Sequence, residues 1–176
     1  TLEKKHDKYF LRFTYAEEVS LNRTPVKEQT ICSVDLGINT DAVCTIMRPD
    51  GTILGRKFIN FPSDKDRMYR VLGRIRRFQR EHGSRQTQGR WAYAKRLNTE
   101  LGRKIAKEIV LYASEKKADV IVFEYLEMKG KLSGKKKQKL QMWRKRDIQK
   151  RCGQQAHRKG IRISRICAWN TSRLAF

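Results

Sequence analysis

The sequence lacks three features: a long apolar run, closely spaced cysteines and a normal share of acidic residues. No stretch approaches the roughly 20 apolar residues of a membrane-spanning helix. No basic segment followed by an apolar one resembles a signal peptide. We therefore expect a cytoplasmic protein with no membrane partner. The sequence begins at Thr1 rather than at methionine, so we expect it to be a piece of a longer protein.

The four cysteines, Cys32, Cys44, Cys152 and Cys167, stand far apart in the sequence. Structural zinc sites usually pair cysteines two to four residues apart, so the spacing predicts no zinc site. Cys32 and Cys44 lie within strand-like runs, where a free cysteine packs as a small hydrophobic residue. The cysteines are thus expected to be reduced thiols.

Acidic residues are scarce relative to basic ones. The chain carries 41 Lys and Arg against 18 Asp and Glu, a formal net charge of +23 in 176 residues. Such an excess far exceeds what solubility requires and is typical of nucleic-acid-binding proteins. The 39% of hydrophobic residues fall in periodic blocks and are enough for one core,.

The chain divides near residue 28. Aromatic residues alternate with others from Tyr9 to Tyr15, a pattern that predicts a strand,. From Glu17 to Glu28 the apolar content falls, which indicates a linker,. We interpret residues 1–28 as the end of a preceding β-rich module plus a linker. Residues 29–176 form the main domain, which the sequence predicts to be an α/β fold.

The first candidate functional residue is Asp35, which ends a short apolar run from Ile31 and precedes the permissive Gly37,. Burying a carboxylate without a partner is costly, so metal or phosphate chemistry at this strand end would explain it. The alternative is an ordinary strand-to-turn exit, with Asp35 bonding to its own backbone.

The second candidate is Glu124, which follows the apolar run Val120-Ile121-Val122-Phe123. Acids at two strand exits suit an α/β sheet whose strand ends converge on one site. Asp35 and Glu124 could then share a divalent ion, for which oxygen ligands favour Mg²⁺ or Mn²⁺.

Between the two acids, the spacing of apolar residues changes from one typical of strands to one typical of helices. Two further strands are expected at 41–47 and 52–59, with a turn at Pro49-Asp50-Gly51 between them,. Together with the strand that ends at Asp35, they should form an antiparallel meander. Two helices then follow, the first beginning near Ser63 with Asp66 in a capping pattern, and a loop over 81–89 separates them. A basic loop at 129–137, a helix over 138–157 and a strand over 161–166 complete the predicted order.

The polar faces of the two helices and the later loop are rich in basic residues. We predict that these residues bind nucleic-acid phosphates, although a solvated charged face is the usual meaning of such a pattern. The residues are Arg67, Arg70, Arg74 and Arg77 on the first helix, Lys95, Arg96, Arg103 and Lys104 on the second, and Lys131, Lys135, Lys136 and Lys137 in the loop.

This order of elements resembles the ribonuclease H-like fold. More narrowly, the chain is similar to the RuvC-like nuclease domain of the transposon-associated OrfB/TnpB proteins and of type V CRISPR effectors. Val34-Asp35-Leu36-Gly37-Ile38-Asn39 matches the first catalytic motif of that family, and Ile121-Val122-Phe123-Glu124-Tyr125-Leu126 matches the second. The resemblance covers roughly residues 30–176. It implies a mixed sheet flanked by helices and a prokaryote-like source.

The resemblance also implies a chemistry: two-metal hydrolysis of phosphodiester bonds, with Asp35 and Glu124 as catalytic and metal-binding acids. The partners would be guide RNA and target DNA, with no small-molecule cofactor. The family's third acid is missing, because no Asp or Glu follows Asp147. One alternative is therefore a catalytically incompetent nucleic-acid-binding fragment of the same fold. An actin-like ATPase half is another, although no Gly-rich phosphate-binding turn is found on a later strand.

Overall fold

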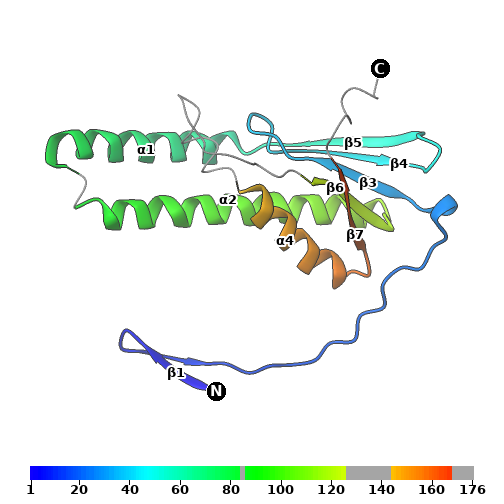
Figure 1. Ribbon diagram of the computed structural model, residues 1–176, viewed down its shortest axis with the longest axis horizontal. Coiled ribbons are helices and arrows are strands. Elements are labelled where there is room, and N and C mark those ends of the chain that lie inside the picture. Colours follow the sequence, from blue (N-terminus) through cyan, green and yellow to red (C-terminus); the bar gives the residue numbers. More distant parts are fainter. Residues whose placement is uncertain (84–85, 126–143, 168–176) are drawn as a thin grey trace.

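A five-stranded mixed sheet forms the centre of the protein in the computed structural model, which describes residues 1–83, 86–125 and 144–167. The strand order is β5-β4-β3-β6-β7, so the strand bearing Asp35 is central (Figure 1). A separate two-stranded sheet, β1-β2, lies at the N-terminus. The chain is thus a mixed α/β protein.

Three consecutive strands make up one half of the sheet. β3 (Ile31–Asp35) pairs antiparallel with β4 (Ala42–Met47), which pairs antiparallel with β5 (Ile53–Ile59). The turn between β4 and β5 contains Gly51, whose φ of 90° lies in the left-handed region that glycine adopts without strain,. The predicted antiparallel meander is confirmed.

The other half of the sheet is parallel. β6 (Val120–Tyr125) pairs parallel with β3, and β7 (Arg162–Cys167) pairs parallel with β6. Parallel neighbours need a crossover connection, and the helical segments of the chain supply it. The carboxyl ends of β3, β6 and β7 therefore meet at one edge of the sheet.

One face of this sheet carries the main core. Cys32 and Val34 on β3 and Ile121 and Phe123 on β6 are almost fully buried against helices α2 (Gln88–Glu115) and α4 (Lys145–His157). Strand residues alternate between faces, so Asp35 and Glu124 lie on the opposite face from this core. In the part of the chain that the structure describes, both packed helices cover the same face. Helices were predicted to flank the sheet; among the described residues they lie on one side.

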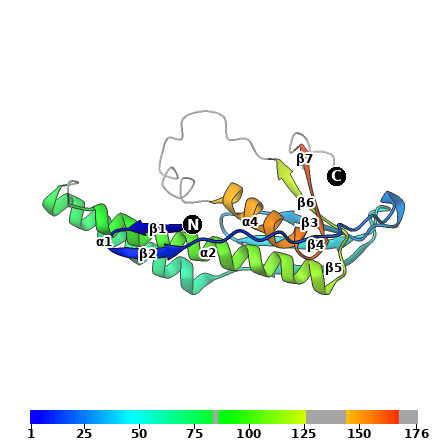
Figure 2. The ribbon, with the colours of Figure 1, turned by 90° about the horizontal axis from the view of Figure 1, so that it is seen from below.

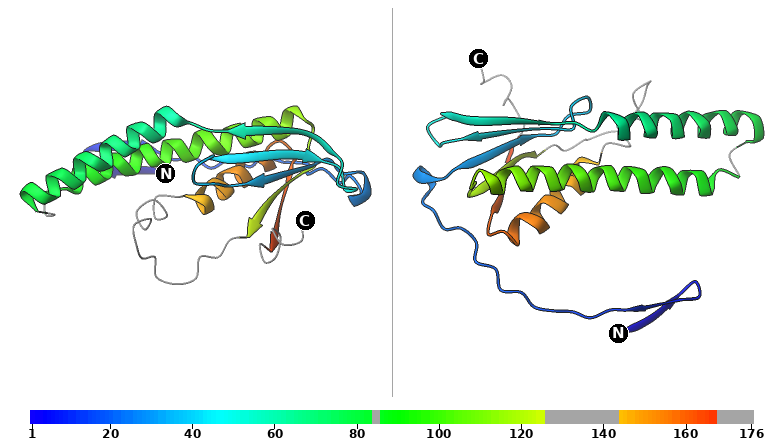
Figure 3. Two further views of the ribbon diagram at one scale, coloured as in Figure 1. Left: turned by 90° about the horizontal axis from the view of Figure 1, so that it is seen from above. Right: turned by 180° about the vertical axis from the view of Figure 1, so that it is seen from behind.

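Helix α1 (Pro62–His82) and α2 form an antiparallel pair that extends well beyond the sheet (Figures 1 and 3). A second, small core holds them together, with Met68 and Ile75 of α1 against Ala94 of α2. Both predicted helices are confirmed, and the loop between them is shorter than predicted because α1 continues to His82 and α2 begins at Gln88.

The start of α1 differs from the expected capping pattern. The helix begins at Pro62, a residue whose fixed φ and missing N–H suit the first turn,. No side chain of α1 caps it. Instead, the Oδ2 atom of buried Asp41 accepts a hydrogen bond from the Phe61 amide at 2.8 Å. The capping role predicted for Ser63 was wrong because the helix already begins at Pro62, so Ser63 lies within its first turn.

The N-terminal strand is shorter than predicted and has a partner that the sequence did not reveal. β1 (Leu2–Lys5) and β2 (Lys8–Leu11) form an antiparallel hairpin. Its two-residue turn, His6-Asp7, has φ values of 45° and 59°, the geometry that matches strand twist in tight hairpins,. The strand ends at Leu11 rather than at Tyr15.

An extended segment connects this hairpin to the sheet (Figure 2). Its end is fixed to the start of β6 through Asp119, which accepts hydrogen bonds from the side chains of Asn22 and Thr24 and from the Thr30 amide. The backbone N–H of Asn22 also donates a hydrogen bond to the carbonyl oxygen of Gly160 at 2.8 Å. The division of the chain near residue 28 stays a prediction.

Two predictions fall partly or wholly outside the described residues. The basic loop at 129–137 lies outside them, and so does the start of the helix predicted over 138–157, which is described from Lys145 onward as α4. No helix in the described ranges is both long and apolar enough to span a membrane.

Candidate metal and nucleic-acid site

The two candidate acids follow the last paired residues of two neighbouring parallel strands, at the carboxyl edge of the sheet. The parallel register pairs Ser33 with Val122 and Val34 with Phe123, so Asp35 and Glu124 each come next on neighbouring strands. Neighbouring strands are about 4.8 Å apart and residues in step share a face. The sheet thus brings together two carboxylates that are far apart in the sequence.

The surroundings of these acids are open. Asp35 is exposed and Glu124 is partly buried. In the same row of the sheet, Val43 stands opposite Asp35 and Ile166 opposite Glu124. Ile166 is 44% exposed. The described residues therefore leave this row of the sheet accessible to a large substrate.

Carboxylates in this arrangement fit a hard divalent cation. Mg²⁺ in proteins usually takes one or two carboxylates and completes its shell with water and substrate phosphates. Within the described ranges no group of three or more His, Cys, Asp or Glu side chains is placed to hold a metal ion. Asp35 and Glu124 can therefore supply the first two ligands, and any further protein ligand would come from outside these ranges.

The turn after Asp35 is held tightly. A Cβ atom on Gly37 would lie 2.5 Å from the carbonyl oxygen of Thr40, so only glycine fits. Lys65 of α1 donates hydrogen bonds to the carbonyl oxygen of Asn39 and forms an ion pair with Asp41 at 3.1 Å. These contacts connect the β3–β4 connection to the start of α1 and restrict the position of the end of β3.

Two residues around the site have roles that the sequence does not predict. Asp41 accepts a hydrogen bond from the Phe61 amide, and the Gln149 side chain donates one to the Glu124 carbonyl oxygen at 3.0 Å. A side chain that bonds to the backbone of a distant residue leaves no periodic signal in a sequence. No pattern could have identified either one.

Three of the predicted phosphate-binding arginines line an open groove of about 880 Å³ along the outer face of α1. The described side chains that line it all come from α1, and Gly73 leaves a gap between them. The lining basic residues are Arg70, Arg74, Arg76, Arg77 and Arg80. Arg70, Arg74 and Arg77 form no ion pair with any described residue. Arg76 and Arg80 extend the predicted set.

Most of the other predicted basic residues on the two helices contact side chains within the protein. Arg67 donates to the Tyr93 hydroxyl at 2.7 Å, and Arg96 lies over the same ring. Arg103 pairs with Glu100, and Lys104 pairs with Asp64 at 2.7 Å. Lys95 is exposed on the same helix. Lys131, Lys135, Lys136 and Lys137 lie outside the described residues.

The pKa values of Lys145 and of two thiols in the core are shifted. Lys145, at the start of α4, is buried, and this burial lowers its pKa, with nearby Arg146 adding to the effect. Farther into the core, the pKa of the Cys32 thiol is raised by its hydrogen bond to Cys44 and by burial, and burial raises that of Cys152. Buried thiols of this kind are poor metal ligands and nucleophiles, so the chemistry of the site rests on the carboxylates.

Comparison with known proteins finds similarity at the level of structure. No protein-family model matches the sequence, and no curated protein matches it. A cryo-EM structure of a Cas12f1–sgRNA–target DNA complex aligns with a TM-score of 0.62 and 19% identity, covering 86% of this chain and 39% of that one. A CRISPR-Cas12f ternary complex aligns with a TM-score of 0.61 and 17% identity, covering 93% of this chain and 32% of that one. The chain spans well under half of either neighbour, and it shares the fold of that part of the Cas12f proteins.

Proposed function

We propose that this chain is the RuvC-like nuclease domain of an RNA-guided DNA endonuclease that hydrolyses phosphodiester bonds with Mg²⁺ or Mn²⁺. The observation that carries the proposal is the parallel register of β3 and β6, in which Asp35 and Glu124 each follow the last paired residues, Val34 and Phe123. The fold shared with Cas12f complexes, one of which contains sgRNA and target DNA, supports the choice of partners.

In this proposal Asp35 and Glu124 hold the divalent ion, and the family's third acid, which no residue after Asp147 supplies, would complete the site. A bound Mg²⁺ or Mn²⁺ supplies Lewis-acid stabilisation of the phosphate and an activated water. The role of the protein is to fix the two carboxylates and to bring the scissile phosphate to them. The α1 arginines contribute to the second task by holding the nucleic-acid backbone, which attracts basic side chains without regard to sequence.

One observation favours a second candidate, a nucleic-acid-binding domain of the same fold without catalysis. Among the described residues only two acids come together, and no three-ligand group is present. With two ligands an ion is held weakly, and the net charge of +23 opposes its binding further,. We therefore expect the 176-residue chain alone to bind metal weakly and to cleave no DNA above background.

Metal binding distinguishes the two candidates. The chain is titrated with Mn²⁺, and free Mn²⁺ is followed by electron paramagnetic resonance. Asp35→Asn and Glu124→Gln remove one charge each while preserving shape, and Glu115→Gln, an exposed acid at the far end of α2, is the matched control. We expect weak Mn²⁺ binding that each site substitution abolishes and the control preserves.

Equal Mn²⁺ binding by the wild type and both site variants would contradict the nuclease proposal and favour the non-catalytic domain. Binding lost in all three variants would show that the chain attracts Mn²⁺ through its acids in general rather than through this pair. That result would also count against the proposal.

A further inference from the structure

Gln149 is one of six polar or charged residues that are buried in the described part of the chain. It lies on α4 and is 8% exposed. Its Nε2 atom donates a hydrogen bond to the main-chain carbonyl oxygen of Glu124 at 3.0 Å, in a partly buried setting. The residue that it contacts is the candidate metal-binding acid on β6.

This hydrogen bond lies where the strand ladder ends. The pairing of β3 with β6 stops at Val34 and Phe123, one residue before the two acids. On its other side β6 remains paired with β7 through Glu124 and Tyr125. The Gln149 amide therefore adds a contact from α4 to the Glu124 backbone, next to the last paired residues of β3 and β6.

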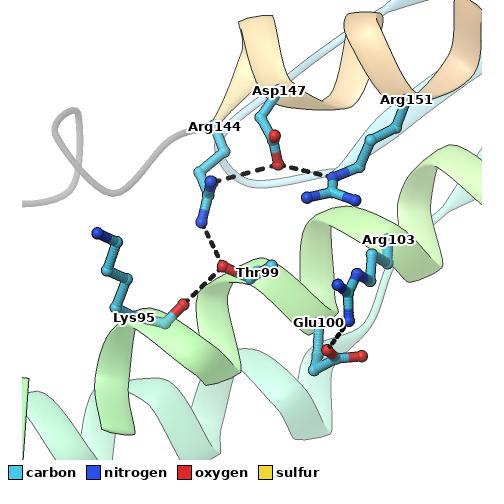
Figure 4. A network of polar contacts seen from close by, with 7 residues as sticks. All are labelled: Lys95, Thr99, Glu100, Arg103, Arg144, Asp147 and Arg151. Atoms are coloured by element: carbon cyan, nitrogen blue, oxygen red, sulfur yellow. Dashed lines mark hydrogen bonds and ion pairs between the residues drawn. The ribbon is translucent and has the colours of Figure 1, made fainter. Parts of the chain in front are cut away.

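The helix that carries Gln149 is itself fixed to α2 and to the core. Figure 4 shows Arg144 donating a hydrogen bond to the Thr99 hydroxyl of α2, while Asp147 pairs with Arg144 at 3.4 Å and Arg151 at 2.9 Å. Ile148, the neighbour of Gln149, is 3% exposed within the main core. The donor thus stands on a helix with little freedom to move relative to the sheet.

We propose that Gln149 is a positioning residue for the candidate site: it fixes the Glu124 backbone so that the carboxylate stays in register with Asp35. This inference rests on the proposed function, because it assigns Gln149 a role in the same site. Groups that orient metal-binding side chains typically change metal affinity by tenfold to a hundredfold when removed. Gln149 acts through the main chain of Glu124 and not by contact with substrate.

The test compares a buried glutamine, Gln149, with an exposed glutamine, Gln154, on the same helix. Gln149→Met keeps the length of the side chain and removes the amide donor. Gln154→Met makes the same change at an exposed position of α4. We expect Gln149→Met to weaken Mn²⁺ binding about tenfold and to shift the melting temperature by no more than about 2–4 °C. Gln154→Met should change neither quantity.

A second variant addresses folding. Gln149→Asn keeps the amide but is one methylene shorter, so it should also lose the bond to Glu124 and weaken Mn²⁺ binding. If both Gln149 variants lose metal affinity only together with a large fall in melting temperature, Gln149 is a core residue and the positioning role is overturned. Wild-type Mn²⁺ affinity in Gln149→Met overturns it as well.

The variant Glu124→Gln separates this inference from the proposed function. If Glu124→Gln abolishes Mn²⁺ binding and Gln149→Met leaves it unchanged, only the role of Gln149 fails. If Glu124→Gln leaves Mn²⁺ binding unchanged, the site itself fails and the role of Gln149 fails with it.

Discussion

The α1 groove offers a quantitative test of nucleic-acid binding. We consider the triple substitution of Arg70, Arg74 and Arg77 by glutamine, which removes three charges and keeps side chains of moderate length. All three residues are exposed, line the groove and form no ion pair with described residues. Their loss should therefore disturb no contact within the protein, and an effect on binding would report direct phosphate contact.

The helix geometry sets the size of the expected effect. At 1.5 Å per residue, Arg70 and Arg77 lie about 10 Å apart along α1. A strand of B-DNA advances about 3.4 Å per phosphate, so three arginines over this length can each meet a different phosphate. Each lost contact should lower the slope of log K against log salt by about 0.9, giving a total of about 2.7. At roughly 0.1 M salt this corresponds to a loss of affinity on the order of 10² to 10³.

The measurement is fluorescence anisotropy with a labelled duplex of roughly 20 base pairs, the length of a guide–target heteroduplex, at several salt concentrations. The matched control removes the same net charge elsewhere, through Arg48→Gln, Lys116→Gln and Lys159→Gln. These residues are exposed and lie outside the groove. The control should change the slope by much less than the α1 triple.

Two outcomes would refute the reasoning. An unchanged slope in the α1 triple would show that its arginines form only a solvated face. Equal changes of slope in the α1 variant and the control variant would show that the overall charge of +23 drives binding. The groove would then contribute no more than any other basic surface.

Two further predictions follow from burial and close contact. Iodoacetamide should modify exposed Cys167 in the native chain and leave the three buried cysteines untouched, as judged by peptide mass mapping; early modification of a buried cysteine would contradict the core. Gly37→Ala should cost about 1–3 kcal/mol of unfolding free energy in urea, because its Cβ would meet the Thr40 carbonyl oxygen,. Gly73→Ala, with open space around it, should instead stabilise α1 by up to about 1 kcal/mol,; equal effects of the two substitutions would count against the tight turn.

Periodicity predicted the elements that carry the core. The apolar runs that include Val34 and Phe123 located strands β3 and β6, and the helical spacing of Met68 and Ile75 located α1, because burial selects apolar residues at these positions,. Chain order and the likeness to known motifs then placed the acids at strand ends. The sequence could not give the strand order, since pairing of β3 with β6 joins residues almost ninety positions apart.

The unpredicted features are polar contacts between distant segments. Asp119 accepts hydrogen bonds from the linker, Asp41 accepts one from the Phe61 amide before α1, and Gln149 donates one to the Glu124 carbonyl oxygen. Each contact satisfies a backbone or polar group that burial would otherwise leave unpaired, at a cost of about 1–3 kcal/mol. Such contacts depend on the packed geometry and not on local pattern. They were visible only once the strands and helices were in place.

Helix α2 connects the two parts of the proposed function. Its later half, including Ile105 and Ile109, packs in the main core beneath the sheet, and its earlier half, including Ala94, packs against α1. A helix of 28 residues is about 42 Å long and bends little without proline or inserted groups,. The α1 arginines are therefore held at a fixed offset from Asp35 and Glu124. Under the proposed function, nucleic acid bound along α1 would be held at this same offset from the two acids.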